Sequence, residues 1–99
     1  MAILQINVVP LGTDEASISS FVTKACKAAQ EMGLKYEVNA MSTIIEGDQD
    51  ELFKAAQKMH EITLKMGAER VITSFSLDER IDKTTDMENM VEAVIDPME

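Results

Sequence analysis

The sequence predicts an α+β fold in which two helices cover one face of a four-stranded antiparallel sheet. Residues 17–32 and 49–66 repeat their apolar side chains with the period of an α-helix. Four short stretches rich in β-branched and apolar residues flank them: one precedes the first helix, two lie between the helices and one follows the second. The length of 99 residues suits one domain, residues 1–99, with one modest core.

The first strand is expected at residues 2–9, and Pro10 should end it. Alternate side chains of a strand share a face, so this strand has an apolar face and a mixed face. The apolar face carries Leu4, Ile6 and Val8 and should lie under the helices. The mixed face carries two amides, Gln5 and Asn7.

Both long helices carry signals at their ends. A short polar residue that can cap the first backbone N–H groups stands at the start of each, and a Gly suited to a left-handed conformation follows each end. These residues are Asp14 or Ser17 with Gly33 for the first helix, and Asp48 with Gly67 for the second.

Three further strands are expected at residues 34–40, 42–47 and 69–77. A C-terminal helix is expected at residues 84–95, with Thr84 or Thr85 as its cap and Pro97 as its stop. The order β-α-β-β-α-β is that of the ferredoxin-like sandwich, and right-handed crossovers place both helices on the same face of its sheet. The sequence thus predicts a ferredoxin-like βαββαβ sandwich with an extra C-terminal helix.

The sheet face without helices is the candidate site. Strand alternation gathers short amides, hydroxyls and a few apolar side chains there: Gln5, Asn7, Asn39, Met41, Thr43, Ile45, Ser74 and Ser76. Lys, Glu and Arg are commoner on a solvated face, whereas short uncharged groups suit a half-buried surface that offers donors and acceptors. Such a surface is typical of a ligand site or of an interface between the sheets of two subunits, and one surface can be both.

Composition narrows the classes of partner. The net charge of −9 repels phosphate backbones and anionic lipid surfaces and mildly favours a small cation, so we expect neither nucleic acid nor a membrane as partner. No apolar run reaches the roughly 20 residues that span a bilayer, and the first residues lack the basic start of a signal peptide, so we expect a cytoplasmic protein. Aromatic residues make up only 4%, which favours stabilisation by assembly with further copies.

Residues that often carry catalysis are sparse. Cys26 is the single cysteine, which excludes an internal disulfide and a thiolate metal cluster, and we interpret it as a small buried apolar residue. His60 is the single histidine and has no companion at the spacing of zinc ligands, so we expect it to pack or to contact a subunit. The sequence has no nucleophile elbow and no phosphate loop. We therefore expect no enzyme, no metal site and no cofactor.

Several segments, taken together and in order, carry a resemblance. They are VVPLGT at residues 8–13, GLKYEVNAMSTIIEG at 33–47, RVITSFSLDERIDK at 70–83 and MENMV at 87–91. The combination resembles the small thiamine-binding protein family, which is related to the YkoF type, and the likeness runs nearly end to end. The chain departs from the family pattern at Ser42, usually Gly, at Ile81, usually Arg, and at Asn39 and Ala40, usually Thr or Ser followed by Pro.

The resemblance implies a ferredoxin-like subunit that assembles into dimers and dimers of dimers (a homotetramer). It also implies binding of thiamine, or of its hydroxymethylpyrimidine part, without catalysis. Met41, Thr43 and Glu46 match the family's hairpin motif and are assigned to the ligand, and strand alternation adds Asn7 and Asn39. The amides and Thr43 would bond the pyrimidine edge, Met41 would lie against a ring face, and Glu46 would hold the ring amine or the cation.

Two alternatives remain open. A structural or regulatory homo-oligomer without a small ligand would use the same polar face only as an interface. A small enzyme of vitamin metabolism would depend on His60 or Glu46. Alternation places Glu46 on the face opposite Thr43, so the alternative role of Glu46 is the neutralisation of the nearby helix start or a subunit contact. The charged turn at residues 78–83 is either a solvated salt-bridge cluster or an intersubunit contact, and the C-terminal helix should pack on a partner subunit.

Overall fold

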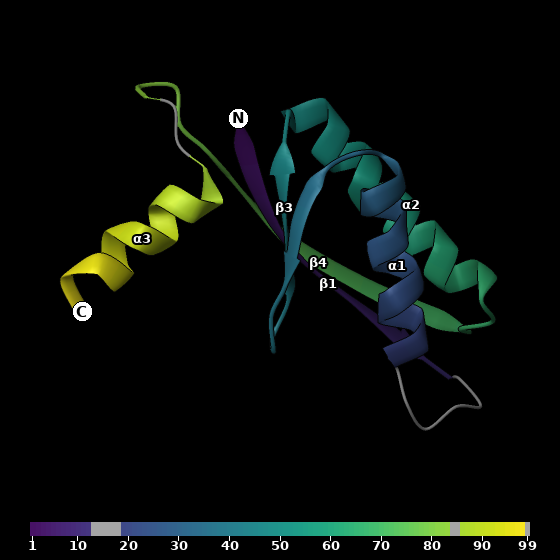
Figure 1. Cartoon of the computed structure of the whole chain (residues 1–99). Coiled ribbons are helices and arrows are strands. Elements are labelled where there is room, and N and C mark those ends of the chain that lie inside the picture. Colours follow the sequence, from purple (N-terminus) through teal and green to yellow (C-terminus); the bar gives the residue numbers. More distant parts are fainter. Residues whose placement is uncertain (13–18, 84–85, 99) are drawn as a thin grey trace.

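The computed structural model describes residues 1–12, 19–83 and 86–98, and its elements follow the predicted order (Figure 1). They are β1 (Ala2–Leu11), α1 (Ser19–Glu31), β2 (Lys35–Val38), β3 (Thr43–Gly47), α2 (Gln49–Lys65), β4 (Arg70–Glu79) and α3 (Met87–Met98). The strand pairs are antiparallel and the sheet order is β2-β3-β1-β4. Helices α1 and α2 lie side by side on one face of the sheet. The predicted fold, a ferredoxin-like sandwich with an extra C-terminal helix, is confirmed.

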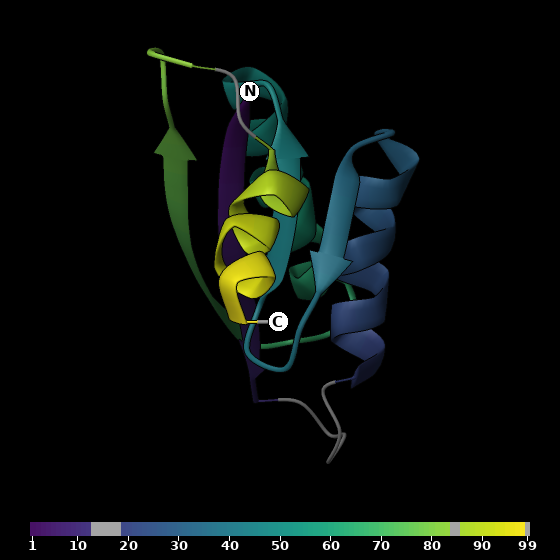
Figure 2. The same cartoon turned by 60° about the vertical axis from the view of Figure 1, so that its left-hand side comes forward.

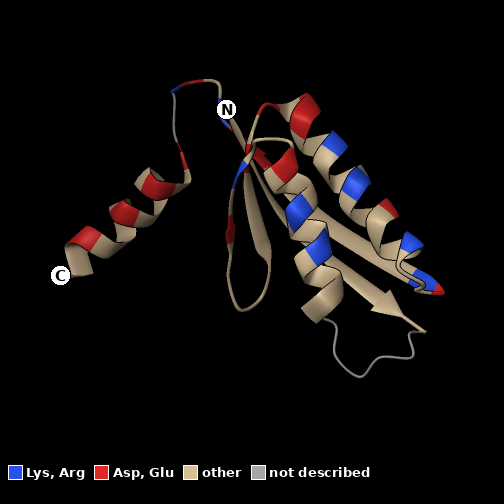
Figure 3. Ribbon diagram, turned by 45° about the vertical axis from the view of Figure 1, so that its right-hand side comes forward, with Lys and Arg blue, Asp and Glu red and all other residues tan. Residues whose placement is uncertain are grey.

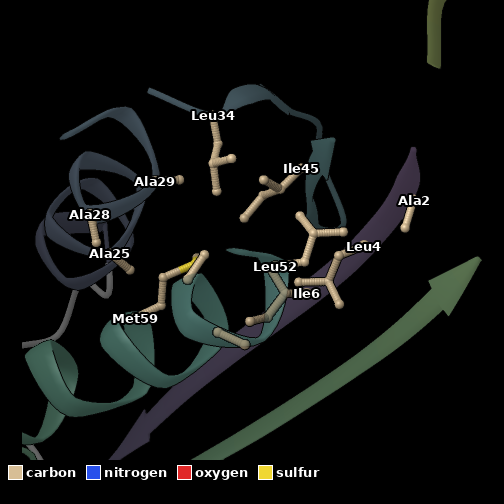
Figure 4. Close-up of a cluster of buried hydrophobic side chains, with 12 residues drawn as sticks. Ala2, Leu4, Ile6, Ala25, Ala28, Ala29, Leu34, Ile45, Leu52 and Met59 are labelled. Carbon is tan, nitrogen blue, oxygen red and sulfur yellow. The ribbon is translucent and has the colours of Figure 1, made fainter. Parts of the chain in front are cut away.

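The core lies between the sheet and these two helices (Figure 4). Leu4, Ile6 and Ile45 project from the sheet into this space, where they meet two side chains of α2. The α2 side chains are Leu52 and Met59, and each of these core residues is at most 2% exposed. Small residues let α1 approach closely: Ala25, Ala28 and Ala29. Because Leu52 is fully buried, its truncation to Ala would cost roughly 2–5 kcal/mol of stability.

The ends of the helices follow the expected chemistry in part. As predicted, Gly33 and Gly67 follow α1 and α2. Their φ angles are 74° and 105°, values that residues with a Cβ rarely adopt. Asp48 occupies the N-cap position of α2, but its side chain makes no capping hydrogen bond. Four expected caps lie outside the described residues: Asp14, Ser17, Thr84 and Thr85. At α3, Asp86 accepts the backbone N–H of Asn89 through Oδ1 at 2.8 Å.

Two prolines that were expected to end elements lie just inside them. Pro10 pairs opposite Val71 within β1, one residue before that strand ends. Pro97 lies within α3, one residue before that helix ends. At the end of an element the missing backbone N–H of Pro removes one hydrogen bond at most, so the element continues for one more residue.

The hairpin between β2 and β3 departs most from the expected sheet. Strand β2 ends at Val38 rather than at residue 40, and residues 39–42 turn the chain. Val38 pairs directly with Thr43, and directly opposed residues share a face. Thr43 therefore lies on the helix-covered face, as does Ile45, which pairs with Leu4. The expectation that Thr43 and Ile45 lie on the open face is wrong, because the hairpin register sets the face and alternation does not continue through the turn.

The open face is the sheet face away from α1 and α2, and on β1 and β4 its polar residues are as predicted. The opposed pairs on it are Gln5–Ser76 and Asn7–Ser74. Asn39 and Met41 belong to the turn and not to a strand, so strand alternation, from which their face was predicted, does not apply to them.

Helix α3 stands apart from the other elements on the open side of the sheet (Figures 1 and 2). Met87 is its one buried residue, and its other apolar side chains are exposed: Met90, Val91, Val94, Ile95 and Met98. The Cα radius of gyration is 14.7 Å, above the ~13 Å of a compact domain of this length. The single chain therefore leaves an apolar helix surface uncovered. None of the helices in the described ranges combines the length and the hydrophobicity that crossing a bilayer requires.

Candidate functional site

A cavity of about 540 Å³ opens where β3 is shorter than β1. The pairing of β1 with β3 stops at Ile6 opposite Thr43, but β1 continues along β4 to Leu11. On this flank, no strand of the described residues pairs with β1 beyond Ile6, and the turn at residues 39–42 and helix α1 border the gap. The volume falls within the range of small-molecule sites, about 300–1,000 Å³.

The lining of this cavity is mainly apolar, with a few short polar groups. Apolar side chains come from the sheet and from both covering helices, and they include Ile6, Val8, Val22, Ala25, Val38 and Met59. The polar groups are those of Asn7, Asn39, Ser42, Thr43 and Ser74. Asp, Glu, Lys, Arg and His are absent from the described residues that line it. This composition suits an organic ligand that is held by apolar contacts and oriented by hydrogen bonds.

Asn39 builds the turn that borders the cavity. Its Oδ1 accepts the backbone N–H groups of Met41 and Ser42 at 3.0 and 2.9 Å and the Ser42 hydroxyl at 3.3 Å. Its backbone N–H donates to the Ser42 carbonyl at 2.9 Å. This is the local bonding by which Asn favours turns, and it explains a polar residue in the middle of the hairpin. The Asn39 Nδ2 donates to none of the described residues, so its two protons are available to a ligand.

Gln5 ties this turn to β1. Its Nε2 donates to the Ser42 Oγ at 3.0 Å, and Ser42 is buried. Ser42 is not among the ligand residues predicted from the sequence, although it lines the cavity. The Asn-x-x-Ser spacing at residues 39–42 is the signal that could have found it, because an Asn side chain in a turn commonly bonds the residues that follow.

Thr43 reaches the cavity from the helix-covered side. It is buried, and its Oγ1 lies 3.6 Å from the Sγ of Cys26 on α1. A thiol is a weak donor and acceptor, so the Thr43 hydroxyl keeps most of its capacity for a ligand. Cys26 is buried, as predicted, and it also lines the cavity, which its sequence neighbours do not indicate.

Asn7 and Ser74 line the cavity from the open face, where they oppose each other across β1 and β4. Neither side chain bonds to another described residue. Met41 lies in the turn and is 82% exposed. The structure thus brings together four of the residues assigned to the ligand, namely Asn7, Asn39, Met41 and Thr43.

Glu46 does not join them. It is 5% exposed, and its Oε1 accepts the backbone N–H of Met87, the first residue of α3, at 3.2 Å. Its Oε2 lies 3.9 Å from the Lys35 Nζ. Lys35 also pairs with Glu88 of α3, and the hydrogen bond to Glu88 raises the pKa of Lys35. Glu46 therefore anchors the start of a helix, as its alternative role required, but the helix is α3 and not α2, the helix nearest to it in the sequence.

His60 also lies outside the cavity lining. Its Nδ1 is 2.7 Å from the Thr73 Oγ1, and this hydrogen bond joins α2 to β4. The same two elements are joined by Phe53 and Phe75, whose rings meet edge to face with centroids 5.9 Å apart. This contact agrees with the packing role expected for His60. In the part of the chain that the structure describes, no group of three or more His, Cys, Asp or Glu side chains could hold a metal ion.

Comparison with known proteins identifies the family. The model of the thiamine-binding protein family matches residues 4–95. A UPF0045 protein of Methanothermobacter thermautotrophicus is 37% identical over 95 residues, which cover 95% of this chain and 96% of that protein. This chain therefore belongs to the thiamine-binding protein family, as the resemblance of its motifs predicts. The family is named for binding, not for a reaction.

Solved structures share the fold. Hypothetical protein MJ1052 of Methanocaldococcus jannaschii matches with a TM-score of 0.87 at 38% identity, and 94% of each chain is covered. A Thermotoga maritima protein, provisionally described as a thiamine biosynthesis or salvage protein, matches with a TM-score of 0.77 at 21% identity and covers 93% of this chain and 97% of its own. At that identity the likeness is one of fold.

Proposed function

We propose that this protein binds thiamine, or its hydroxymethylpyrimidine part, in the cavity beside residues 39–42 and does not change it chemically. One observation carries the proposal: Asn7, Asn39 and Thr43 surround one mainly apolar cavity in a member of this family. The cavity is large enough for a ligand of that size.

The polar groups match the pyrimidine part of the ligand. An aminopyrimidine has hydrogen-bond donors and acceptors along one edge. The Asn39 Nδ2 protons, which are not donated to any described residue, suit a ring nitrogen, and the Asn7 amide and Thr43 hydroxyl can each donate or accept. The apolar side chains around them suit the ring faces, which have no polar atoms to satisfy.

The charge distribution suits the thiazolium part, which is permanently cationic. The chain has a net charge of −9, and the described lining residues contain no Lys or Arg to repel a cation. The Met41 thioether is polarizable and flexible, so it can lie against a ring at the turn. Glu46 has no part in this proposal, because its carboxylate is engaged with α3.

The enzyme alternative has weaker support. It needs His60 or Glu46, and these side chains bond to Thr73 and to the Met87 backbone outside the cavity lining. A general acid or base has to lie within hydrogen-bond reach of the reacting atoms. Binding without catalysis is therefore the better proposal.

We further propose that the functional unit is an assembly of copies, with the dimer of dimers that the family resemblance implies. The exposed apolar side chains of α3 favour a partner, and so does Ile81, which is 100% exposed in the charged turn. Asn7 and Ser74 lie on the same open face as α3, so an interface over this face would close the cavity on that side. A cytoplasmic location fits this role and remains a prediction.

Calorimetric titration of the purified protein with thiamine and with hydroxymethylpyrimidine tests the proposal. We expect binding at micromolar or lower Kd with one ligand per chain. Native mass spectrometry of the same sample would report the number of subunits. Flat titrations with both compounds on an intact assembly would overturn the ligand proposal and favour a structural homo-oligomer.

A further inference from the structure

A second cavity of about 320 Å³ lies beside the first, between α1 and the edge strand β2. Val22, Cys26 and Val38 line both cavities, so the two adjoin along these side chains. The other lining residues are Thr23, Lys27, Gln30 and Tyr36. A ligand that fills the first cavity could therefore extend a substituent past Cys26 and Val38 into this groove.

The chemistry of the groove differs from that of the first cavity. Lys27 is the one cation among its described lining residues, and no Asp or Glu is among them. Helix α1 contains Lys24 and Lys27 and shows basic positions in Figure 3, whereas the charged residues of α3 are all acidic. Although the net charge of the chain is −9, the charged side chain that lines this groove is a cation.

Hydrogen-bond donors accompany the charge. The Gln30 amide and the Tyr36 hydroxyl bond to no described residue, so both can serve a ligand. The Thr23 hydroxyl is less available, because it donates to the Ser19 carbonyl at 2.8 Å. A group of side chains that combines an ammonium with neutral hydrogen-bond donors and lacks a carboxylate can bind a phosphate group.

We propose that this groove takes the phosphate of a phosphorylated ligand whose ring system occupies the first cavity. The ligand class is thus a phosphate ester of thiamine or of hydroxymethylpyrimidine, with Lys27 contacting the phosphate and Tyr36 or Gln30 donating to it. This inference rests on the proposed function, because the first cavity must hold the rings. Lys27 is exposed, so the expected gain from its contact is modest, roughly 3–10-fold in Kd.

The test compares two compounds that differ only in the phosphate. Calorimetry of the full chain with thiamine and with thiamine monophosphate gives the ratio of their Kd values. We expect the monophosphate to bind several-fold more tightly, and Lys27→Gln to bring the ratio toward one. Lys24→Gln is the matched control, since it removes the same charge from the same helix at a residue that does not line the groove. Its ratio should stay at the wild-type value.

A second variant tests the hydrogen bond, because a change of charge alone could act at long range. Tyr36→Phe keeps the ring and removes the hydroxyl, and we expect it to lower the ratio as well. If thiamine binds and the monophosphate binds no more tightly, the groove inference fails and the proposed function stands. If Lys24→Gln lowers the ratio as much as Lys27→Gln does, the loss of positive charge acts at long range and not through contact with the phosphate, and the inference is wrong. If neither compound binds, the groove inference fails, and the titration with hydroxymethylpyrimidine decides whether the proposed function stands.

Discussion

Val38 and Thr43 face each other across the β2–β3 hairpin, and this one pairing places the Thr43 hydroxyl on the inner side of the sheet. The cavity is consequently lined from both sides: Asn7 contributes from the open face, Thr43 from the helix-covered face and Asn39 from the turn between the strands. The proposed ligand would therefore lie beside the start of β3, at the margin of the sheet, and not flat upon its open face.

Changing Asn39 separates its role in the turn from its role at the ligand. Asn39→Asp keeps an oxygen to accept the Met41 and Ser42 N–H groups but removes the Nδ2 donor. We expect stability close to wild type and an affinity for neutral hydroxymethylpyrimidine lower by roughly 3–10-fold, the value of one hydrogen bond. Asn39→Ala should also lose about 1 kcal/mol in urea unfolding. Unchanged affinity in the Asp variant would remove Asn39 from the site.

Thr43→Val should lower the affinity for hydroxymethylpyrimidine by roughly 3–10-fold, because Val keeps the shape of Thr and lacks the hydroxyl. The loss in stability should stay below about 1 kcal/mol, since among the described residues the hydroxyl contacts only the weakly bonding thiol of Cys26. Thr73→Val provides the control, as Thr73 bonds His60 outside the cavity lining. Equal losses in the two variants, measured by calorimetry, would contradict a direct contact of Thr43.

Glu46→Ala should loosen α3 without affecting the ligand. The substitution removes the acceptor of the Met87 N–H and one neighbour of Lys35, at a cost of about 1 kcal/mol. Hydrogen exchange should therefore quicken at the start of α3, while calorimetry with thiamine should give the wild-type Kd. Glu46→Gln retains an acceptor, so hydrogen exchange at the start of α3 should be slower in this variant than in Glu46→Ala. A large fall in thiamine affinity in Glu46→Ala would show that Glu46 contributes to ligand binding.

A charge on the apolar side of α3 should disrupt assembly. Val94→Glu places a carboxylate among exposed apolar residues that we expect a partner to cover, so the mass in native mass spectrometry should fall. Glu92→Gln, on the same helix, should leave the mass unchanged. An unaltered mass in the Val94 variant would show that α3 is not part of an interface.

The charged turn gives a prediction for pH. Arg80 donates through Nε to the Asp82 Oδ1 at 2.8 Å, and this hydrogen bonding lowers the pKa of Asp82 from its ordinary 3.8. The pair's contribution to stability is thus complete above the ordinary pKa and is lost as the pH falls through the lowered one. Carboxyl NMR should show the pKa of Asp82 rising in Arg80→Gln. A pKa that does not move would refute the pairing in solution.

Much of the fold can be predicted because its signals are local. The apolar periods of residues 17–32 and 49–66 mark the faces that α1 and α2 bury, and Gly33 and Gly67 mark their ends. The order of elements then restricts the topology, since right-handed crossovers leave few arrangements. The motifs spread along the chain also suffice to identify its family.

The sequence by itself therefore determined the fold class, the helix faces and the family, because each depends on periodicity or on motifs within short segments. Only the tertiary structure decided the site. The cavity exists because β3 begins only at Thr43, opposite Ile6, while β1 runs on to Leu11, and because α1 brings Cys26 beside Thr43. Glu46 binds the start of α3, 41 residues further along the chain. Such relationships depend on hairpin register and on packing between distant segments, which side-chain alternation along one strand does not encode.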